Sequence, residues 1–150
     1  MATGWRVTKV RHHPYDGTGA RLHGARWSSP GREVMYASDT FAGAILEILA
    51  HSQRPRTLPG PHHAVRIDIP DELVELVEAE ELSGWEAKQS PEARELGDRW
   101  LEEERSAVLS VPSVPARPIG RTLMINPEHR DAPTIEVSDP FPVPWDERLF

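Results

Sequence analysis

The alternation of apolar and polar positions divides the chain into short strands and helices. Six segments predict strands, over residues 5–10, 32–38, 64–69, 106–111, 121–125 and 134–137. Helices are predicted from Ser38 or Asp39, as N-cap, to about His51, over residues 71–81, and over residues 90–105 with Ser90 as N-cap. The glycine-containing residues 17–24 predict a loop, and the tail over residues 140–150 predicts extended chain.

The order of these elements indicates the fold class. Strands and helices are mixed without the regular alternation of a doubly wound sheet, which predicts an α+β fold with a largely antiparallel or mixed sheet. The chain has 150 residues, which is the usual size of one domain and enough for a hydrophobic core. We therefore expect a single domain over residues 1–150.

Composition narrows the range of functions. The formal net charge of −7 leaves no broad basic field for a nucleic-acid backbone, so any basic site must be local. Cysteine is absent, and no apolar run approaches the roughly 20 residues of a membrane span. The sequence thus predicts a soluble, cytoplasmic protein. It predicts no metal site, because the adjacent histidines at 12–13 and 62–63 point to opposite sides of an extended chain.

The helix that ends near His51 carries a single carboxylate, Glu47, in the sequence FAGAILEILAH. On a helical projection, Glu47 lies in a narrow strip of small residues, opposite an apolar arc of Phe41, Ala42, Ile45, Leu46, Ile48 and Leu49. Such a strip suits a pocket wall, in which a desolvated carboxylate needs an arginine or a hydroxyl nearby. A polar edge facing water fits the pattern equally well, and so does an intrahelical pair with His51.

Other chemically useful residues lie at predicted strand ends and in turns. Arg26, in GARW, is suited either to holding a phosphate group through its planar guanidinium or to stacking on Trp27 at the surface. Tyr36 offers an aromatic face and a hydroxyl to a nucleotide, or else half-buried packing. Ser113 and Asn126 each follow a predicted strand, where site residues and backbone caps are both common. The residues by themselves leave these alternatives open.

Six segments occur in an order and spacing typical of one known family. They are GTGARLHGARWSSPG, VMYAS, AILEILAH, LGDRWLEEERSAVLSVPSV, LMINPEH and the closing WDERLF. On these segments the chain resembles, nearly end to end, the RES-domain toxins of bacterial toxin–antitoxin pairs, which are named for an arginine, a glutamate and a serine. The resemblance places this triplet on Arg26, Glu47 and Ser113, with Tyr36 as a further active-site residue.

Two more residues match the family less specifically. Arg6, in the opening WRV, resembles an early arginine of the family, and Asn126 matches a residue that lines the pocket. Ala25 and Ser28 depart from the family pattern, which usually has two glycines before the arginine and an asparagine after the tryptophan.

The resemblance implies a fold similar to that of ADP-ribosyltransferases, in which a split sheet holds NAD in a cleft. It also implies an activity that destroys NAD as a substrate, by hydrolysis or by phosphorolysis. Glu47 would then orient the nicotinamide ribose and stabilise the cationic charge that develops as nicotinamide leaves. Arg26, with Arg6, would neutralise the diphosphate. Tyr36 would contact the nicotinamide ribose, and Ser113 would position ribose, phosphate or the nucleophile.

The same resemblance implies a protein partner, an antitoxin with an Xre-type helix-turn-helix domain. This partner would block the cleft and bind DNA, so that the present chain touches DNA only through it. A mono-ADP-ribosyltransferase remains an alternative, but many such enzymes carry glutamate or glutamine two residues before the catalytic glutamate, where this chain has Ile45. A non-catalytic binding module is the third possibility, with the acidic predicted helices from Asp71 and Ser90 as docking surfaces.

Overall fold

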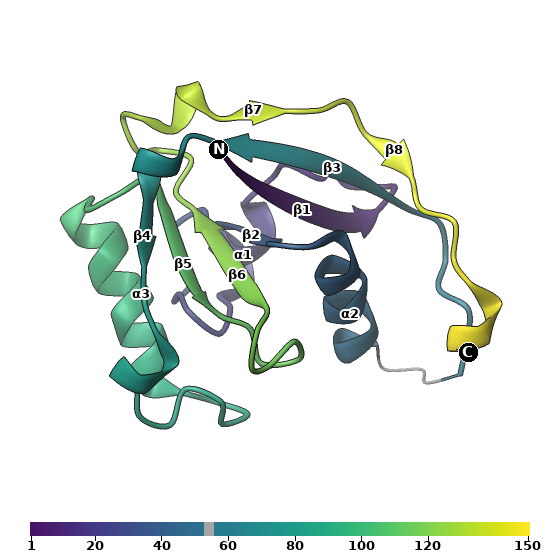
Figure 1. The fold of residues 1–150 in the computed structure, drawn as a ribbon, viewed down its shortest axis with the longest axis horizontal. Helices are drawn as coiled ribbons and strands as arrows, with labels where there is room; N and C mark the ends of the chain where they lie inside the picture. The colour runs from purple at the N-terminus through teal and green to yellow at the C-terminus, as the bar shows by residue number, and fades with distance from the viewer. Residues whose placement is uncertain (53–55) are drawn as a thin grey trace.

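The computed structural model of the chain describes residues 1–52 and 56–150 (Figure 1). Its strands are β1 (Ala2–Lys9), β2 (Met35–Ser38), β3 (His62–Ile69), β4 (Val74–Leu76), β5 (Val108–Pro112), β6 (Arg121–Ile125), β7 (Glu136–Val137) and β8 (Phe141–Pro142). Its α-helices are α1 (Thr18–His23), α2 (Phe41–His51) and α3 (Pro91–Glu103). Short 3₁₀ turns lie at Asp71–Leu73, Ala79–Glu81, Ala132–Thr134 and Glu147–Leu149.

The strands of the described residues form one mixed sheet. Their order is β4-β5-β6-β2-β1-β3-β7, and β8 also pairs with β3. Neighbouring strands are antiparallel except for β4 and β5, which run parallel. The α+β architecture with a mixed sheet that we expected from the sequence is therefore confirmed.

The sheet is nearly divided between β1 and β2. Strand β1 pairs with β3 along its whole length, from Ala2 opposite Ile69 to Lys9 opposite His62, but it pairs with β2 only at Trp5 and Ser38. In Figure 1, β4, β5 and β6 run roughly vertically, whereas β1 and β3 run across the top and α2 lies below β1. The two parts of the sheet thus splay apart at this joint, which gives the split sheet that the family resemblance implied.

Successive residues of β5 and β6 pack into cores on opposite faces of the sheet, because side chains alternate along a strand. On one face, Val108, Leu123 and Ile125 join Val65 and Ile67 of β3. On the other face, Leu109, Val111 and Met124 join Trp100 and Leu101 of α3. A third cluster places Phe41, Ile45 and Ile48 of α2 against Val7, Ala64 and Val143. The α2 and α3 helices are therefore fixed by separate cores.

Helix α3 comes unusually close to the segment around Trp27. A Cβ atom placed on Gly97 would lie 1.6 Å from the carbonyl oxygen of Trp27, so only glycine fits at this position. Asp98 adds two hydrogen bonds, accepting from the backbone N–H of Ser29 at 2.8 Å and from its hydroxyl. The guanidinium of Arg94 donates to the carbonyl of Ala25 at 3.2 Å. Helix α3 thus sets the position of residues 25–29.

Residues 71–81 do not form the predicted helix. They form two 3₁₀ turns with β4 between them, and Val74–Leu76 pairs with Val108–Ser110 of β5. The apolar positions of this segment fit a helix and a strand alike over so short a stretch. Pairing with β5 and burial of Leu73 and Val77 decide between the two.

The glycine-containing region contains a short helix that we did not predict. Thr18–His23 forms α1, and Gly24, with φ at +70°, ends it. None of its residues is buried, so the sequence carries no apolar periodicity to indicate it. The prediction of a loop over residues 17–24 is therefore wrong.

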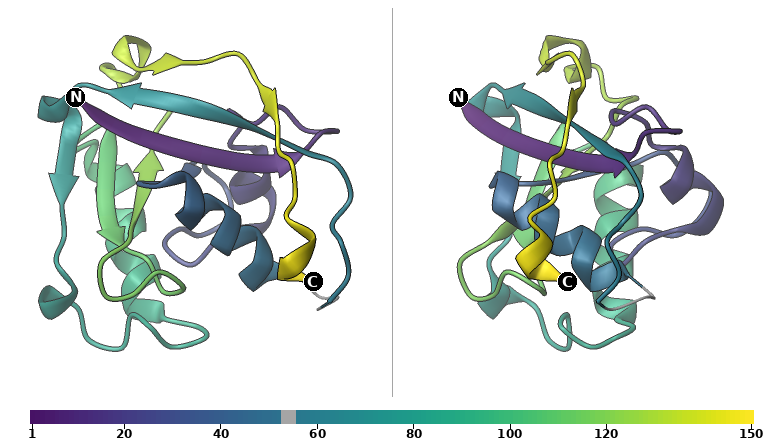
Figure 2. Two further views of the ribbon diagram at one scale, coloured as in Figure 1. Left: turned by 45° about the vertical axis from the view of Figure 1, so that its right-hand side comes forward. Right: turned by 90° about the vertical axis from the view of Figure 1, so that its right-hand side faces the viewer.

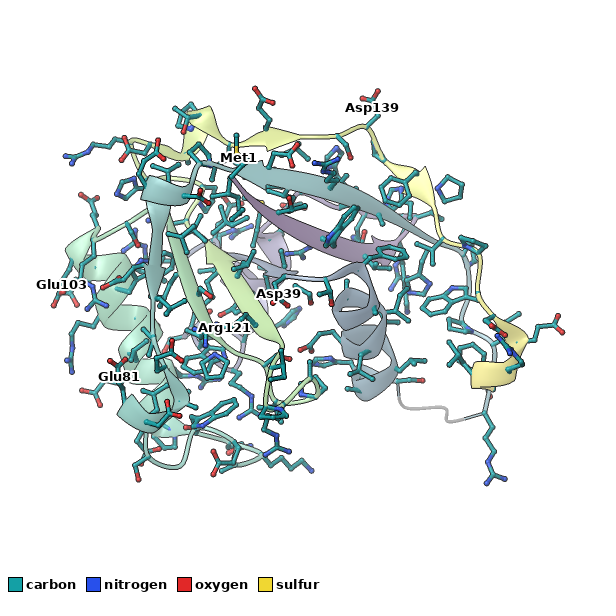
Figure 3. The ribbon with its side chains drawn as sticks, viewed as in Figure 1. Met1, Asp39, Glu81, Glu103, Arg121 and Asp139 are labelled. Atoms are coloured by element: carbon teal, nitrogen blue, oxygen red, sulfur yellow. The ribbon has the colours of Figure 1, made fainter. Side chains whose placement is uncertain are left out.

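The N-cap of α2 is Thr40, not Ser38 or Asp39. The hydroxyl oxygen of Thr40 accepts a hydrogen bond from the N–H of Gly43 at 2.9 Å. Ser38 belongs to β2, and the Asp39 carboxylate accepts from the backbone N–H of Arg121 at 3.0 Å (Figure 3). Asp39 therefore ties the start of α2 to β6.

The C-terminal part of the chain runs along β3, to which both β7 and β8 are paired (Figure 2). Its extended character agrees with the prediction at β8, but Glu147–Leu149 forms a 3₁₀ turn. Within the described residues, no helix is long and apolar enough to cross a membrane.

Candidate active site

A cleft opens where β1 and β2 part. Its volume is about 590 Å³, within the range of roughly 300–1,000 Å³ typical of small-molecule and cofactor sites. Its lining includes residues 5–7 of β1, 25–27 before β2, 36–38 of β2, Ala44, Glu47, Ile48, Ala50 and His51 of α2, Lys88, Pro112, Val114, Pro115 and Thr122. The joint in the sheet therefore brings together segments that are far apart in the sequence.

Glu47 lies in this cleft with two nearby partners. The Ser113 hydroxyl donates to Oε1 of Glu47 at 3.4 Å, and Nδ1 of His51 lies 3.7 Å from Oε2. The intrahelical pair of the two side chains is thus present at 3.7 Å, and the same His51 atom lies closer, at 2.8 Å, to the Glu47 carbonyl oxygen. The Glu47 side chain is 32% exposed, which means that it is half-buried at a cleft wall and not pointing into bulk water.

The α2 helix differs in part from the predicted arrangement of faces. Ala44, on the predicted strip of small residues, is buried, and it lines the cleft together with Glu47 and Ala50. Ala42 and Leu46, which we placed on the buried arc, are exposed, Leu46 to 38%. The reason is that β1, β3 and the C-terminal segment cover only part of that arc, and Phe41, Ile45 and Ile48 are the residues that pack.

Arg26 joins the wall of the cleft to a distant loop. Its Nη1 atom donates to the carbonyl oxygens of Trp85 at 2.8 Å and Ala87 at 2.5 Å. The neighbouring Trp27 packs against Trp85, with ring centroids 6.2 Å apart. Arg26 is therefore not a surface arginine stacked on Trp27. It bonds to the 85–87 backbone and also lines the cleft.

Tyr36 reaches the cleft from β2, and its hydroxyl is engaged by a buried serine. The hydroxyls of Tyr36 and Ser28 lie 2.6 Å apart, and Ser28 is fully buried. Burial raises the pKa of Tyr36 above its ordinary value, so its hydroxyl stays protonated at neutral pH. Ser28, one of the two departures from the family pattern, thus fixes the Tyr36 ring.

Arg6 of β1 lines the same cleft as a half-buried cation. Its Nη1 atom donates to the Tyr36 carbonyl at 3.4 Å, while its buried Nε makes no hydrogen bond within the part of the chain that the structure describes. Burial lowers the pKa of Arg6, and the nearby Asp16 carboxylate opposes this effect. As a cation that lines the cleft, Arg6 is suited to an anionic ligand.

Ser113 and Asn126 lie in different places. Ser113 is buried, donates to Glu47, and accepts from the N–H of Ala116 at 3.3 Å. Asn126 is also buried, but it follows the end of β6 opposite to Thr122, and its side-chain oxygen accepts from the N–H of Glu128 at 3.1 Å. Neither residue is among those that line the cleft, but the structure brings Ser113 to Glu47, whereas Asn126 caps the backbone at Glu128.

The cleft has a local charge opposite to that of the whole chain. Among the described residues that line it, Arg6, Arg26 and Lys88 are cationic and Glu47 is the one carboxylate, whereas the chain carries a formal net charge of −7. Lys88 is a lining residue that our sequence analysis missed, because nothing in the pattern around it indicates a site. In chemical terms, the cleft suits an anionic ligand with a developing positive charge near Glu47.

A double-mutant cycle tests the Tyr36–Ser28 contact. Tyr36→Phe should lower the free energy of unfolding by about 1–2 kcal/mol, because the buried Ser28 hydroxyl loses its partner. Adding Ser28→Ala should then cost less than it does in the unmodified chain. Urea unfolding of the four proteins measures the coupling, and strictly additive effects would show that the two hydroxyls do not interact.

Comparison with known proteins gives a consistent result. The family described as RES domain matches residues 3–146. "Toxin Res" of Pseudomonas putida (strain KT2440) is 34% identical over 150 residues, covering 97% of this chain and 98% of that protein. "Prs ADP-ribosylating toxin" of Sphingobium sp. (strain YBL2) is 34% identical over 141 residues, covering 88% and 86%.

A solved structure shares the fold. It is the M. tuberculosis MbcT-MbcA toxin-antitoxin complex, in which the matching chain superposes with a TM-score of 0.78 at 16% identity, covering 95% of this chain and 84% of that one. At this identity the likeness concerns the fold alone, whereas the family match covers nearly the whole sequence. The split sheet, the cleft and these comparisons together show that the chain belongs to the RES-domain toxin family.

Proposed function

We propose that this protein is the toxin of a toxin–antitoxin system and that it cleaves the bond between nicotinamide and ribose in NAD. One observation carries the proposal. The Glu47 carboxylate, paired with the Ser113 hydroxyl, lies in a cleft whose other walls present Arg6 and Arg26. NAD has a positively charged nicotinamide ribose end and an anionic diphosphate, and the cleft offers a complementary charge to each.

Glu47 acts on the charge that develops during the reaction. As the bond to nicotinamide lengthens, the ribose carbon takes on the character of an oxocarbenium cation, and a preorganised carboxylate stabilises it. The half-buried position of Glu47 favours this role, because partial exclusion of water strengthens the interaction. The Ser113 hydroxyl orients the carboxylate and positions ribose or the incoming nucleophile.

The cationic residues bind the other end of the substrate. Arg6 lines the cleft with a guanidinium that no carboxylate pairs among the described residues, which makes it a suitable anchor for a phosphate oxygen. Arg26 contributes positive charge at the cleft wall while its Nη1 holds the loop at Trp85 and Ala87. Tyr36, fixed by Ser28, forms a rigid wall for the nicotinamide ribose. We give Asn126 no part, because it neither lines the cleft nor contacts Glu47, and its side-chain oxygen caps the backbone at Glu128.

Transfer of ADP-ribose to a protein is the second candidate, and one relative favours it directly. The Sphingobium protein is named an ADP-ribosylating toxin of Prs. Against it, the residue two positions before Glu47 is Ile45, which packs in the core between α2 and the sheet and offers no polar group to a protein acceptor. We therefore propose simple NAD destruction, with water or inorganic phosphate as the acceptor.

Identification of the products separates these acceptors. Purified protein is incubated with NAD, with and without inorganic phosphate and with a lysate as a source of protein acceptors, and products are identified by mass spectrometry. Free ADP-ribose indicates hydrolysis, and a phosphorylated ADP-ribose formed only with phosphate indicates phosphorolysis. Persistent NAD together with an ADP-ribosylated protein would overturn NAD destruction in favour of the transferase.

The solved structure that shares the fold is a toxin–antitoxin complex, which supports a protein partner here. We propose an antitoxin with an Xre-type helix-turn-helix domain, which covers the cleft and provides the contact with DNA. Co-expression with the product of a neighbouring gene of that type should yield a complex that leaves NAD intact. A stable complex with undiminished NAD cleavage would contradict occlusion of the cleft.

A further inference from the structure

The loop between the turn Ala79–Glu81 and α3 is anchored to the active-site wall at two points. Arg26 donates to the carbonyls of Trp85 and Ala87, and the Trp85 side chain, 5% exposed, packs on Trp27. Since Ala87 is held directly, the position of the next residue along the chain, Lys88, is also set, and Lys88 lines the cleft.

The Lys88 ammonium has no competing partner. Lys88 is exposed, and it makes no ion pair or side-chain hydrogen bond with any residue in the ranges 1–52 and 56–150, whereas Arg26 is bonded to the carbonyls of Trp85 and Ala87. Arg121, for comparison, donates to the carbonyls of Val77 and Ser110. The Lys88 charge is therefore available to a ligand in the cleft.

Lys88 and Arg26 both line the cleft, and the loop that carries Lys88 is bonded to Arg26. Among the described residues that line it, the cleft has three cationic side chains and one carboxylate, Glu47, which comes from another element, α2. An ammonium group on a flexible stem is a strong ligand for phosphate oxygens and follows them as the ligand moves. Arg26, by contrast, has Nη1 committed to the loop backbone.

We propose that Lys88 is a substrate-binding residue that neutralises the diphosphate of NAD, and that Arg26 positions it by holding the loop at Trp85 and Ala87. This role of Lys88 rests on the proposed function, to which it adds a further residue that binds the diphosphate. Arg26 then contributes to binding both by its own charge and through Lys88. Glu47 and Ser113 act at the ribose carbon whose bond to nicotinamide is cleaved.

Kinetics of lysine variants test this role. Lys88→Ala should raise the KM for NAD by about tenfold while kcat changes by less than about twofold, because a contact to the diphosphate is equally strong before and during bond cleavage. Lys88→Arg should restore most of the affinity. The dependence of KM on salt should also be weaker in Lys88→Ala, since one screened charge pair is missing.

The chain offers a matched control, because Lys9 and Lys88 are its two lysines. Lys9 is exposed at the end of β1 and does not line the cleft, so Lys9→Ala should leave KM and kcat unchanged. In the catalytically impaired Glu47→Gln variant, saturating NAD should slow acetylation of Lys88 by an amine-reactive ester at least about fivefold and leave Lys9 unaffected. Mass spectrometry measures both sites in one sample.

The outcomes of these experiments test the role of Lys88 separately from the proposed cleavage of NAD. An unchanged KM in Lys88→Ala, together with equal acetylation of Lys88 with and without NAD, would overturn the role of Lys88 and leave NAD cleavage standing. A folded wild-type protein that neither binds nor cleaves NAD would overturn the proposed function and this inference together. A higher KM with a protected Lys88 supports both.

Discussion

Glu47→Gln should lower the rate of nicotinamide release from NAD by at least about a hundredfold. Glutamine has the same shape and can still accept from the Ser113 hydroxyl, so the cleft should keep its geometry. It lacks the negative charge that stabilises the cationic sugar, and the loss should therefore fall on kcat far more than on KM. Time courses of nicotinamide formation at several NAD concentrations measure the two constants.

Expression in cells provides the corresponding biological result. Induction of the wild type should arrest growth and deplete NAD, whereas Glu47→Gln and Arg26→Ala should both permit growth. Glu102→Gln, an exposed substitution on α3 that also removes one carboxylate, is the matched control and should remain toxic. If Glu47→Gln and Arg26→Ala stay fully toxic, the mechanism is wrong. If the wild type itself is not toxic and Glu47→Ala changes none of its properties, the non-catalytic binding module is favoured.

Gly97→Ala should destabilise the protein by about 3 kcal/mol or more, although glycine-to-alanine changes in helices ordinarily stabilise them. The added Cβ would meet the Trp27 carbonyl oxygen at 1.6 Å, and a backbone atom cannot rotate away. Helix α3 must therefore move outward, which withdraws packing of Trp100 and Leu101 from the sheet. Thermal or urea unfolding measures the loss.

Gly19→Ala is the matched control for this substitution. Gly19 lies in α1, and a Cβ placed there has no neighbour within 4 Å, so alanine should be neutral or stabilise by up to about 1 kcal/mol. Gly97→Ala should also weaken NAD cleavage in the fraction that stays folded, because α3 positions residues 25–29 around Arg26. Equal stability of the two variants would contradict the close packing of α3 on Trp27.

Elements with strong local signals could be predicted from the sequence. Ser90 followed by Pro91 indicates a helix start, and the Ser90 hydroxyl oxygen does accept from the N–H of Ala93 at 3.1 Å. The β-branched runs of β5 and β6 likewise lie where the pattern predicts them, at Val108–Pro112 and Arg121–Ile125. In these cases local propensity and tertiary packing favour the same structure.

Elements decided by distant contacts could not be predicted. Residues 71–81 satisfy helical spacing, but Val74–Leu76 gains a partner strand in β5, and no local pattern reveals it. The N-cap of α2 is Thr40 and not the predicted Ser38, because Ser38 belongs to β2 and pairs with Thr122 of β6. Such pairings depend on residues dozens of positions away.

The candidate site shows the same division. Glu47 could be found because a lone carboxylate among small residues is unusual, and the family resemblance supplied Arg26, Tyr36 and Ser113. The contact between Ser113 and Glu47 needed the structure, since 66 positions separate them. Lys88 gives no signal in the sequence, because its place in the cleft follows from the loop that Arg26 holds.

Release of nicotinamide from NAD labelled in its nicotinamide ring tests the central claim most directly, because every acceptor of the ADP-ribose leaves this label behind. The purified wild-type protein should convert labelled NAD to free nicotinamide over many turnovers, and Glu47→Gln should leave the label in NAD. Intact NAD after prolonged incubation with folded wild-type protein, or equal release by the two proteins, would contradict cleavage in this cleft.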